Sequence, residues 1–291
     1  MISYFQAIVI GLLQGVTELF PISSLGHSVL LPAWLGWHGI VDAQSAKESF
    51  YLAFVVALHV GTALALLAYF WRDWRRIIAG FFRTLRTRRL ETVDERMAWL
   101  LIVATIPAGL FGLVLERSLR TVFAKPEAAA AFLTVNGVIL LVGERFRRRG
   151  PAPAQGAAVE PEEGRDPDRL NFKEALAIGA SQIGALFAGI SRSGITMVAA
   201  LVRGLDHEDA ARFTFLLATP IILAAGVYKL PDLTGPLGDG VRGQAIVGAV
   251  CAAAAALVSV HFLVRFFRTR TLLPFAVYSL VVGAISVIRF V

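Results

Sequence analysis

The feature that most constrains the fold is a series of long apolar runs separated by short polar segments. A helix needs about 20 apolar residues to cross the hydrocarbon core of a bilayer. Six runs approach or reach this length, at residues 49–71, 97–115, 128–143, 213–228, 243–264 and 271–288. The composition agrees, because 56% of residues are hydrophobic and only 17% are charged, against about 25% charged in soluble domains. We predict an all-α polytopic membrane protein with six transmembrane helices.

Two further apolar regions, residues 1–37 and 171–204, are broken near their centres by polar residues and glycine. Each is typical of two short helices joined by a turn. Non-helical backbone at membrane depth is tolerated only where protein or a water-filled cavity surrounds it. We therefore predict two re-entrant helix hairpins. The first has no basic residue before it and no small-residue cleavage site, so we expect it to remain in the mature protein.

The two predicted hairpins resemble each other. At an offset of 168, residues 5–28 align without gaps to residues 173–196, and identical residues cluster at the polar break. The turn reads Ile-Ser-Ser-Leu-Gly in the first copy and Ile-Ser-Arg-Ser-Gly in the second. Three predicted spans separate the copies, so the second hairpin enters from the opposite face. This pattern predicts an inverted-topology repeat whose broken helices meet near the membrane midplane.

The basic residues predict how the chain is oriented. The segments that follow residues 49–71, 128–143 and 243–264 are rich in arginine, and the positive-inside rule places such segments in the cytoplasm. The first hairpin then opens to the outer side of the membrane. We assign most of the net charge of +7 to topology and expect no nucleic-acid partner.

The chain is predicted to form one integral membrane domain over residues 1–291. Its first half is 1–147 and contains the hairpin at 1–37. A flexible cytoplasmic linker covers 148–170, where proline, glycine and glutamate are frequent. The second half is 171–291 and contains the hairpin at 171–204.

Polar and ionisable residues inside the two hairpins are the candidates for chemistry, because such residues are costly in a membrane. If the turns meet, a carboxylate, an imidazole, a guanidinium and several hydroxyls converge. A guanidinium binds phosphate oxygens bidentately, and the N-termini of half-helices present N–H groups to an anion. The predicted site therefore suits a phosphate. Its residues are Gln14, Glu18, Ser23, Ser24, His27, Ser191, Arg192, Ser193 and Thr196.

The residue types indicate metal-assisted phosphoryl transfer to water on a substrate whose remainder lies in lipid. Glu18, supported by Gln14, is a candidate to hold a divalent cation or to act as a base. A turn serine or His27 is a candidate nucleophile, and His27 is also a candidate general acid. Three polar residues inside predicted spans are expected instead to form helix–helix hydrogen bonds. They are His59, Asn136 and His261.

Two motifs resemble those of the undecaprenyl-diphosphate phosphatase family of bacitracin resistance proteins. Residues 14–27 read Gln-Gly-Val-Thr-Glu-Leu-Phe-Pro-Ile-Ser-Ser-Leu-Gly-His, and residues 189–196 read Gly-Ile-Ser-Arg-Ser-Gly-Ile-Thr. The resemblance covers essentially the whole chain. Two positions depart from the family pattern: Ala188 stands where a proline is expected, and Leu25 stands where a small hydroxyl residue is common.

The resemblance implies removal of the terminal phosphate from undecaprenyl diphosphate, which regenerates the carrier lipid of peptidoglycan synthesis and confers bacitracin tolerance. It implies a polyprenyl diphosphate substrate in the lipid bilayer and a divalent cation, Mg²⁺ or Ca²⁺. It makes Glu18 a metal ligand or base with Gln14 in support, and it leaves Ser24 and His27 as alternative nucleophiles. The residues that it implies for phosphate binding are Ser23, Ser191, Arg192, Ser193 and Thr196.

Two other functional classes share some of these sequence features. Inverted repeats with broken helices are also typical of transporters, so a transporter or flippase of an anionic lipid is the alternative function. The Ser-Leu-Gly-His stretch superficially matches type 2 phosphatidic acid phosphatases, but Val198 stands where that family needs a histidine. The oligomeric state stays open, with a homodimer among the alternatives.

Overall fold

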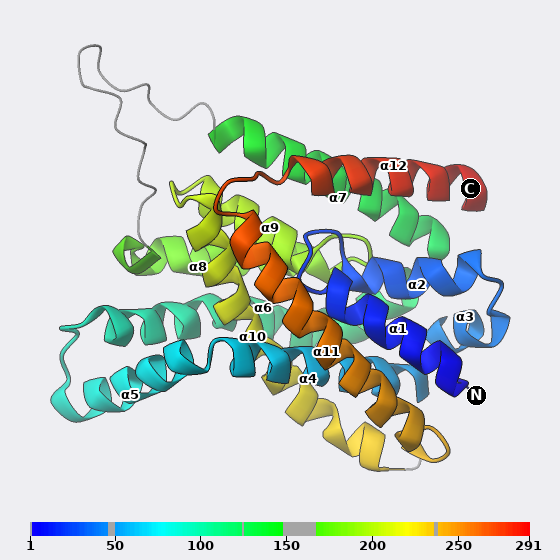
Figure 1. The fold of residues 1–291 in the computed structure, drawn as a ribbon, viewed down its shortest axis with the longest axis horizontal. Helices are drawn as coiled ribbons and strands as arrows, with labels where there is room; N and C mark the ends of the chain where they lie inside the picture. The colour runs from blue at the N-terminus through cyan, green and yellow to red at the C-terminus, as the bar shows by residue number, and fades with distance from the viewer. Residues whose placement is uncertain (1, 46–49, 124, 148–166, 236–237) are drawn as a thin grey trace.

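The computed structural model describes residues 2–45, 50–123, 125–147, 167–235 and 238–291. Every regular element in these ranges is a helix (Figure 1). The six predicted spans are all present as helices, five of which are long and apolar enough on their own to cross a membrane. They are α4 (Phe50–Tyr69), α6 (Val93–Phe123), α7 (Pro126–Arg147), α10 (His207–Thr234), α11 (Arg242–Phe266) and α12 (Leu273–Phe290).

Both predicted hairpins are present. The first consists of α1 (Tyr4–Thr17) and α2 (Ser24–Trp34). The second consists of α8 (Phe172–Ser181), its 3₁₀ continuation η2 (Gln182–Leu186) and α9 (Arg192–Leu201). In Figure 1, α1 starts near both chain termini, whereas α8 starts at the opposite end of the molecule, and the two hairpins meet between them. The fold is therefore the predicted inverted arrangement.

The repeat extends to the hydrogen bonds that start the hairpins. Ser3 caps α1 by accepting the backbone N–H of Gln6, whose side chain accepts the N–H of Ser3. Asn171 and Glu174 make the same reciprocal pair at the start of α8. Such capping boxes satisfy N–H groups that have no partner within the helix. Both residues of the second box lie 168 positions after those of the first, the offset that the sequence alignment gives.

Helix packing follows the repeat as well. Gly11 of α1 packs so closely on α11 that an added Cβ would lie 2.4 Å from the carbonyl oxygen of Gly248. Gly179 of α8 packs equally tightly on α6, where an added Cβ would lie 1.9 Å from the carbonyl oxygen of Ala104. Only glycine allows this approach. The first helix of each hairpin is thus held against one long span of the opposite half.

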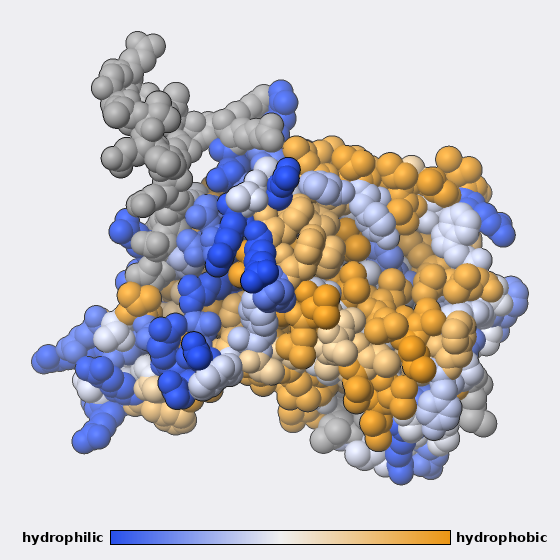
Figure 2. All heavy atoms as spheres, in the orientation of Figure 1, coloured by the Kyte–Doolittle hydropathy of each residue, from blue (hydrophilic) through white to orange (hydrophobic). Residues whose placement is uncertain are grey.

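The segment after α4 differs from the expectation of a basic loop. It forms a further helix, α5 (Trp71–Thr87), turned by 85° from α4. Its apolar residues recur at helical spacing, as in Trp71, Trp74 and Ile78, and its arginines lie beside and opposite this apolar stripe, the pattern of a helix that lies along a membrane surface. Figure 2 shows apolar side chains over the middle of the molecule, while hydrophilic ones gather at the ends, most densely at the end that carries α5.

Two short elements complete the chain. They are α3 (His38–Ser45), which follows the first hairpin, and η1 (Pro167–Arg169), which precedes the second. Most of the predicted linker, residues 148–166, lies outside the described residues.

The largest cluster of buried apolar side chains contains residues of both halves, among them Leu66 of α4, Phe213 of α10 and Val260 of α11. Leu19 and Ile22 of the first turn belong to the same cluster. The first turn therefore rests on the main core, and tight packing of this kind limits its movement.

Candidate active site

The second helix of each hairpin begins at a serine cap. The hydroxyl of Ser23 accepts the N–H of Gly26 at 3.2 Å, and the hydroxyl of Ser191 accepts the N–H of Gly194 at 3.1 Å. Ser23 has a φ of 71°, a left-handed conformation that costs energy for a residue other than glycine and is often found at functional sites. These caps leave the N-termini of α2 and α9 inside the protein, where their free N–H groups favour an anion.

The two turns contact each other directly. Gly189 donates its N–H to the hydroxyl of Ser23 at 3.2 Å, and the hydroxyl of Ser193 donates to the carbonyl of Phe20 at 3.2 Å. Gly189 has a φ of 114°, and an added Cβ would lie 2.5 Å from the carbonyl oxygen of Ala129, so this position needs glycine. The structure therefore brings the two predicted half-sites together.

Asn136 of α7 links both turns. Its buried amide donates to the carbonyl of Pro21 at 2.9 Å and accepts the N–H of Ser191 at 2.9 Å. It also donates to the hydroxyl of Ser279 on α12 at 3.2 Å. The expected helix–helix hydrogen bond is present, but the sequence did not indicate that the same side chain fixes the two turns relative to each other.

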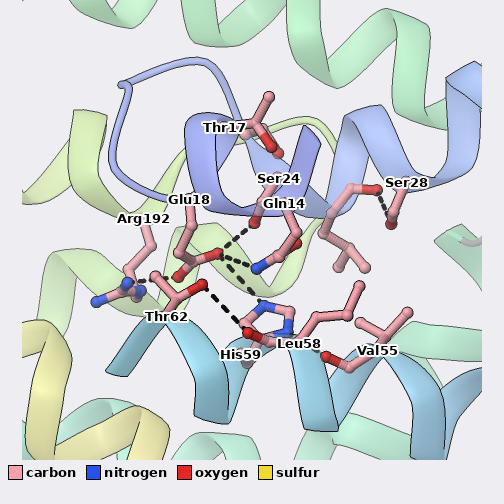
Figure 3. A network of polar contacts seen from close by, with 12 residues as sticks. Gln14, Thr17, Glu18, Ser24, Ser28, Val55, Leu58, His59, Thr62 and Arg192 are labelled. Carbon is pink, nitrogen blue, oxygen red and sulfur yellow. Dashed lines mark hydrogen bonds and ion pairs between the residues drawn. The ribbon is translucent and has the colours of Figure 1, made fainter. Parts of the chain in front are cut away.

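The carboxylate of Glu18 is the centre of a polar cluster (Figure 3). Glu18 is 6% exposed, and its Oε2 accepts from Gln14 Nε2 at 3.0 Å and from the hydroxyl of Ser24. Its Oε1 accepts from Nη2 of Arg192 at 2.6 Å. Nε2 of His59 lies 3.3 Å from Oε2. The four partners come from α1, α2, α9 and α4, so the cluster joins both hairpins to the first long span.

The electrostatics of this cluster follow from its burial. An ionised carboxylate is costly to bury unless it is paired and hydrogen-bonded. Arg192 supplies the opposite charge, and its own side chain is 17% exposed. Ser24 and Arg192 are the first residues of α2 and α9 and lie 168 apart. The two equivalent positions of the repeat thus hold opposite oxygens of one carboxylate.

His59 is a site residue that the sequence reading missed. Its Nδ1 lies 2.8 Å from the carbonyl oxygen of Val55, and because a carbonyl only accepts, Nδ1 carries a hydrogen. This bond turns Nε2 toward Glu18. An ionisable side chain within an apolar run marks a functional candidate, so the sequence contains a signal for His59. It does not identify the partner, because Glu18 lies 41 positions away.

The side chain of His27 makes its hydrogen bonds outside the Glu18 cluster. Its Nδ1 donates to the carbonyl of Ser23 at 2.7 Å, and its Nε2 lies 2.8 Å from the hydroxyl of Tyr278 on α12. The two rings are stacked with centroids 5.7 Å apart. Tyr278 was not predicted, and nothing in its local sequence points to the site.

The remaining predicted hydroxyls are buried and hydrogen-bonded to other groups of the protein. The hydroxyls of Ser191 and Ser193 lie 3.0 Å apart. The hydroxyl of Thr196 donates to the carbonyl of Arg192 at 2.7 Å. In this state they shape the start of α9, and a phosphate would be bound there chiefly by the guanidinium and by backbone N–H groups.

The side chains around Glu18 can be compared with the ligands that a divalent cation requires. Glu18 is the one carboxylate of the cluster, and the described part of the chain contains no group of three or more His, Cys, Asp or Glu suited to a metal. Mg²⁺ is commonly held by one or two carboxylates while substrate phosphates and water complete its shell. Carboxylate and amide oxygens are suitable ligands for such a cation, but here both oxygens of Glu18 accept hydrogen bonds and Gln14 turns its Nε2 toward the carboxylate.

Comparison with known proteins identifies the family of the chain. A family profile described as bacitracin resistance protein BacA matches residues 7–285. Undecaprenyl-diphosphatase 2 of Frankia alni is 53% identical over 99% of this chain and 98% of its own. Undecaprenyl-diphosphatase of Mycolicibacterium paratuberculosis is 56% identical over 99% of this chain and 97% of its own. Undecaprenyl-diphosphatase of Acidiphilium cryptum is 45% identical over 97% and 96%, respectively.

Proposed function

The chain belongs to the bacitracin resistance protein BacA family, and from this membership we propose that it is an undecaprenyl-diphosphatase. It removes the terminal phosphate of undecaprenyl diphosphate and so recycles the carrier lipid of peptidoglycan synthesis, which confers bacitracin tolerance. The names of its relatives support this activity, and none of those reported above is named as a transporter. The observation that carries the proposal is that Ser24 and Arg192 share the buried carboxylate of Glu18.

Arg192 is the proposed phosphate clamp. Without substrate, its guanidinium is held at the start of α9 by Glu18. A diphosphate carries more negative charge than one carboxylate and binds a guanidinium in the same bidentate way. We therefore expect the substrate to take Arg192 from Glu18. This exchange frees the carboxylate at the moment when the substrate is in place.

Ser24 is the proposed nucleophile. Its hydroxyl donates to Glu18, so a base lies within hydrogen-bonding reach of the proton that must leave. The oxygen of Ser24 attacks the terminal phosphorus, its proton passes to Glu18, and undecaprenyl phosphate departs as the anhydride bond breaks. A water then attacks the phosphoserine and gives one proton to solvent. Glu18 returns its proton to the oxygen of Ser24 as inorganic phosphate leaves.

His27 is the alternative nucleophile or the general acid. Both of its ring nitrogens already have partners, Ser23 and Tyr278, so Nε2 must leave Tyr278 before it can reach a substrate. This arrangement favours Ser24 as the attacking group. Once Nε2 is released, His27 is suited to hydrogen-bonding the departing phosphate, while the stacked ring of Tyr278 orients the imidazole.

We propose that Glu18 and Gln14 hold a divalent cation, Mg²⁺ or Ca²⁺, together with the diphosphate. When bound, the cation would offset the charge that develops on the phosphoryl oxygens. The displacement of Arg192 by substrate frees an oxygen of Glu18 for this purpose.

The orientation in the membrane and the oligomeric state are further parts of the proposal. The protein is a multi-pass membrane protein, and we place its arginine-rich end in the cytoplasm, so that the first hairpin opens outward. Labelling of single cysteines from either side of intact cells tests this orientation. The homodimer stays a prediction, tested by the mass of the solubilised protein.

Release of inorganic phosphate from undecaprenyl diphosphate by the purified protein tests the proposed function. We expect release by the wild type with Mg²⁺ or Ca²⁺, and a loss of at least about 100-fold in Glu18→Ala and Arg192→Ala. His261→Gln, another histidine within a span but outside the site, should keep the wild-type rate. Full rates in both His27→Ala and Arg192→Ala would contradict the assigned site, and transport without hydrolysis would contradict the activity.

A further inference from the structure

A groove of about 480 Å³ lies between α5, α6 and α10. Its lining is almost entirely apolar and comes from one side of α5, from α6 between Ala98 and Leu110, and from Pro220 of α10. Ile102, Ile106 and Leu110 are exposed along its edge, so the groove opens toward the surrounding bilayer. None of its lining residues belongs to the Glu18 cluster.

The length of the groove matches one lipid chain. It follows α6 from Ala98 to Leu110, about 18 Å at a rise of ~1.5 Å per residue. The hydrocarbon region of one leaflet is about 15 Å deep, half of the bilayer core. A single acyl chain that enters from the surface and runs along α6 therefore fills it, whereas an undecaprenyl chain is far longer than the groove.

Arginines lie where the headgroup of such a lipid would be. The guanidinium groups of Arg72 and Arg75 stack over Trp71 at 5.5 and 5.2 Å from its ring. Arg75 shares a face of α5 with Ile78, which lines the groove, because residues three apart on a helix are neighbours. Within the described ranges neither Arg72 nor Arg75 is paired with a carboxylate.

The next arginine provides a contrast. Arg76 is paired with Asp73 at 2.8 Å, and Arg212 of α10 shares the same carboxylate at 2.6 Å. Unlike the charge of Arg76, the charges of Arg72 and Arg75 are not neutralised by a carboxylate within the described ranges, so both are available to an external anion. The 85° turn between α4 and α5 sets α5 across the direction of the preceding span, as expected of a helix that lies at a membrane surface.

We propose that this groove binds one chain of an anionic phospholipid, with its phosphate against Arg72 and Arg75. The apolar lining and its length select a single chain of the adjacent leaflet. The two unpaired guanidinium groups select an anionic headgroup over a zwitterionic one. Such a lipid would fix the angle between α5 and α6 and thereby stabilise the fold without taking part in hydrolysis.

Gly109 offers a direct way to close the groove. It lines the deep end, and an added Cβ would meet nothing within 4 Å, so a larger side chain can extend into the groove without a clash at its base. Gly112, one turn further along α6, is equally open but does not line the groove. Gly109→Phe and Gly112→Phe are therefore a matched pair on one helix.

The test uses the full-length protein in nanodiscs of phosphatidylcholine with and without phosphatidylglycerol. Native mass spectrometry counts the lipids retained, and thermal unfolding reports stability. We expect the wild type and Gly112→Phe to retain one phosphatidylglycerol and to unfold at a higher temperature when it is present. Gly109→Phe should lose both effects. Arg72→Ala combined with Arg75→Ala should bind phosphatidylglycerol on the order of tenfold more weakly.

Three results would overturn the proposal. The first is retention of phosphatidylcholine as well as phosphatidylglycerol by the wild type, which would leave no role for the arginines. The second is unchanged phosphatidylglycerol binding by Gly109→Phe, which would place the lipid elsewhere. The third is displacement of the retained phosphatidylglycerol by undecaprenyl phosphate in the wild type, which would assign the groove to the lipid product.

Discussion

Nη2 of Arg192 donates to Oε1 of Glu18 over 2.6 Å, although the two residues are 174 positions apart and belong to different hairpins. The bond closes a carboxylate cluster that neither hairpin forms alone. It also explains how a charged pair persists at membrane depth, because each residue supplies the counter-charge that the other requires.

Loss of Arg192 should affect stability as well as activity. Arg192→Ala leaves the carboxylate of Glu18 buried without its counter-charge, which costs about 3–5 kcal/mol in comparable pairs. We expect a clear drop in the thermal unfolding temperature. Combining it with Glu18→Gln should recover most of the stability but none of the activity. Equal unfolding temperatures for Arg192→Ala and the wild type would show that the pair is not buried as described.

Arg192→Lys separates charge from geometry. Lysine keeps the positive charge but cannot bind two phosphate oxygens through a planar fork. We expect a fold close to that of the wild type, with phosphate release lowered by about 10–100-fold. Wild-type kcat in Arg192→Lys would mean that charge alone is needed at this position.

The nucleophile can be identified by trapping the phosphorylated enzyme. Rapid acid quenching of the wild type with substrate labelled in its terminal phosphate should leave label on Ser24, and Ser24→Ala should take up none. His27→Ala should still be labelled, since its ring bonds to Tyr278 and not to Glu18. Label that survives in Ser24→Ala and disappears in His27→Ala would reverse the assignment.

His59 should support the Glu18 carboxylate as a hydrogen-bond donor. Hydrogen bonds to charged groups contribute about 1.5–3 kcal/mol, so His59→Leu should lower kcat by about tenfold or more with little change in KM. Glutamine keeps an N–H at similar reach, and His59→Gln should retain most of the activity. His261→Leu serves as the control within another span. The prediction fails if glutamine and leucine at position 59 are equally damaging.

Asn136 should hold the two turns in register. Asn136→Leu leaves the carbonyl of Pro21 and the N–H of Ser191 buried without partners, each at a cost of about 1–3 kcal/mol. We expect reduced stability together with reduced kcat. Ser279→Ala removes only the bond to α12 and should be much milder. A stable, fully active Asn136→Leu would show that the turns are positioned by packing alone.

The cation prediction rests on Glu18 and Gln14. A chelator should abolish phosphate release, and added Mg²⁺ or Ca²⁺ should restore it. Gln14→Ala should raise the cation concentration needed for half-maximal activity, because it removes a proposed ligand and a donor to Glu18. Full activity in the presence of chelator would contradict the cation proposal while leaving the roles of Ser24 and Arg192 open to their own tests.

The fold could be predicted from the sequence because membrane spans and their interruptions are local signals. Span length follows from bilayer thickness, and the two broken runs share an offset that also governs their caps, from Ser3 and Asn171 to Ser23 and Ser191. The charge pattern predicts a loop in place of α5, because arginines after a span are typical of topology signals. The helical spacing of Trp71, Trp74 and Ile78 was available to correct this.

The site could be predicted only in part. Glu18, Ser24 and Arg192 were named because they lie in the two motifs, and the structure brings them together. His59 and Tyr278 come from long helices, where a lone polar residue gives no indication of the neighbour that it faces. The side of each helix that faces the site depends on packing between segments distant in the sequence. A single sequence does not reveal this packing.

The central claim is that one active site is assembled from both hairpins around Glu18 and Arg192. The most direct test is the kcat for phosphate release from undecaprenyl diphosphate in Glu18→Ala, Arg192→Ala and the double variant. Because the two residues act as a unit, we predict that the double variant loses no more than the worse single one, a strong departure from additivity. Losses that simply multiply, or a wild-type kcat in either single variant, would contradict a shared site.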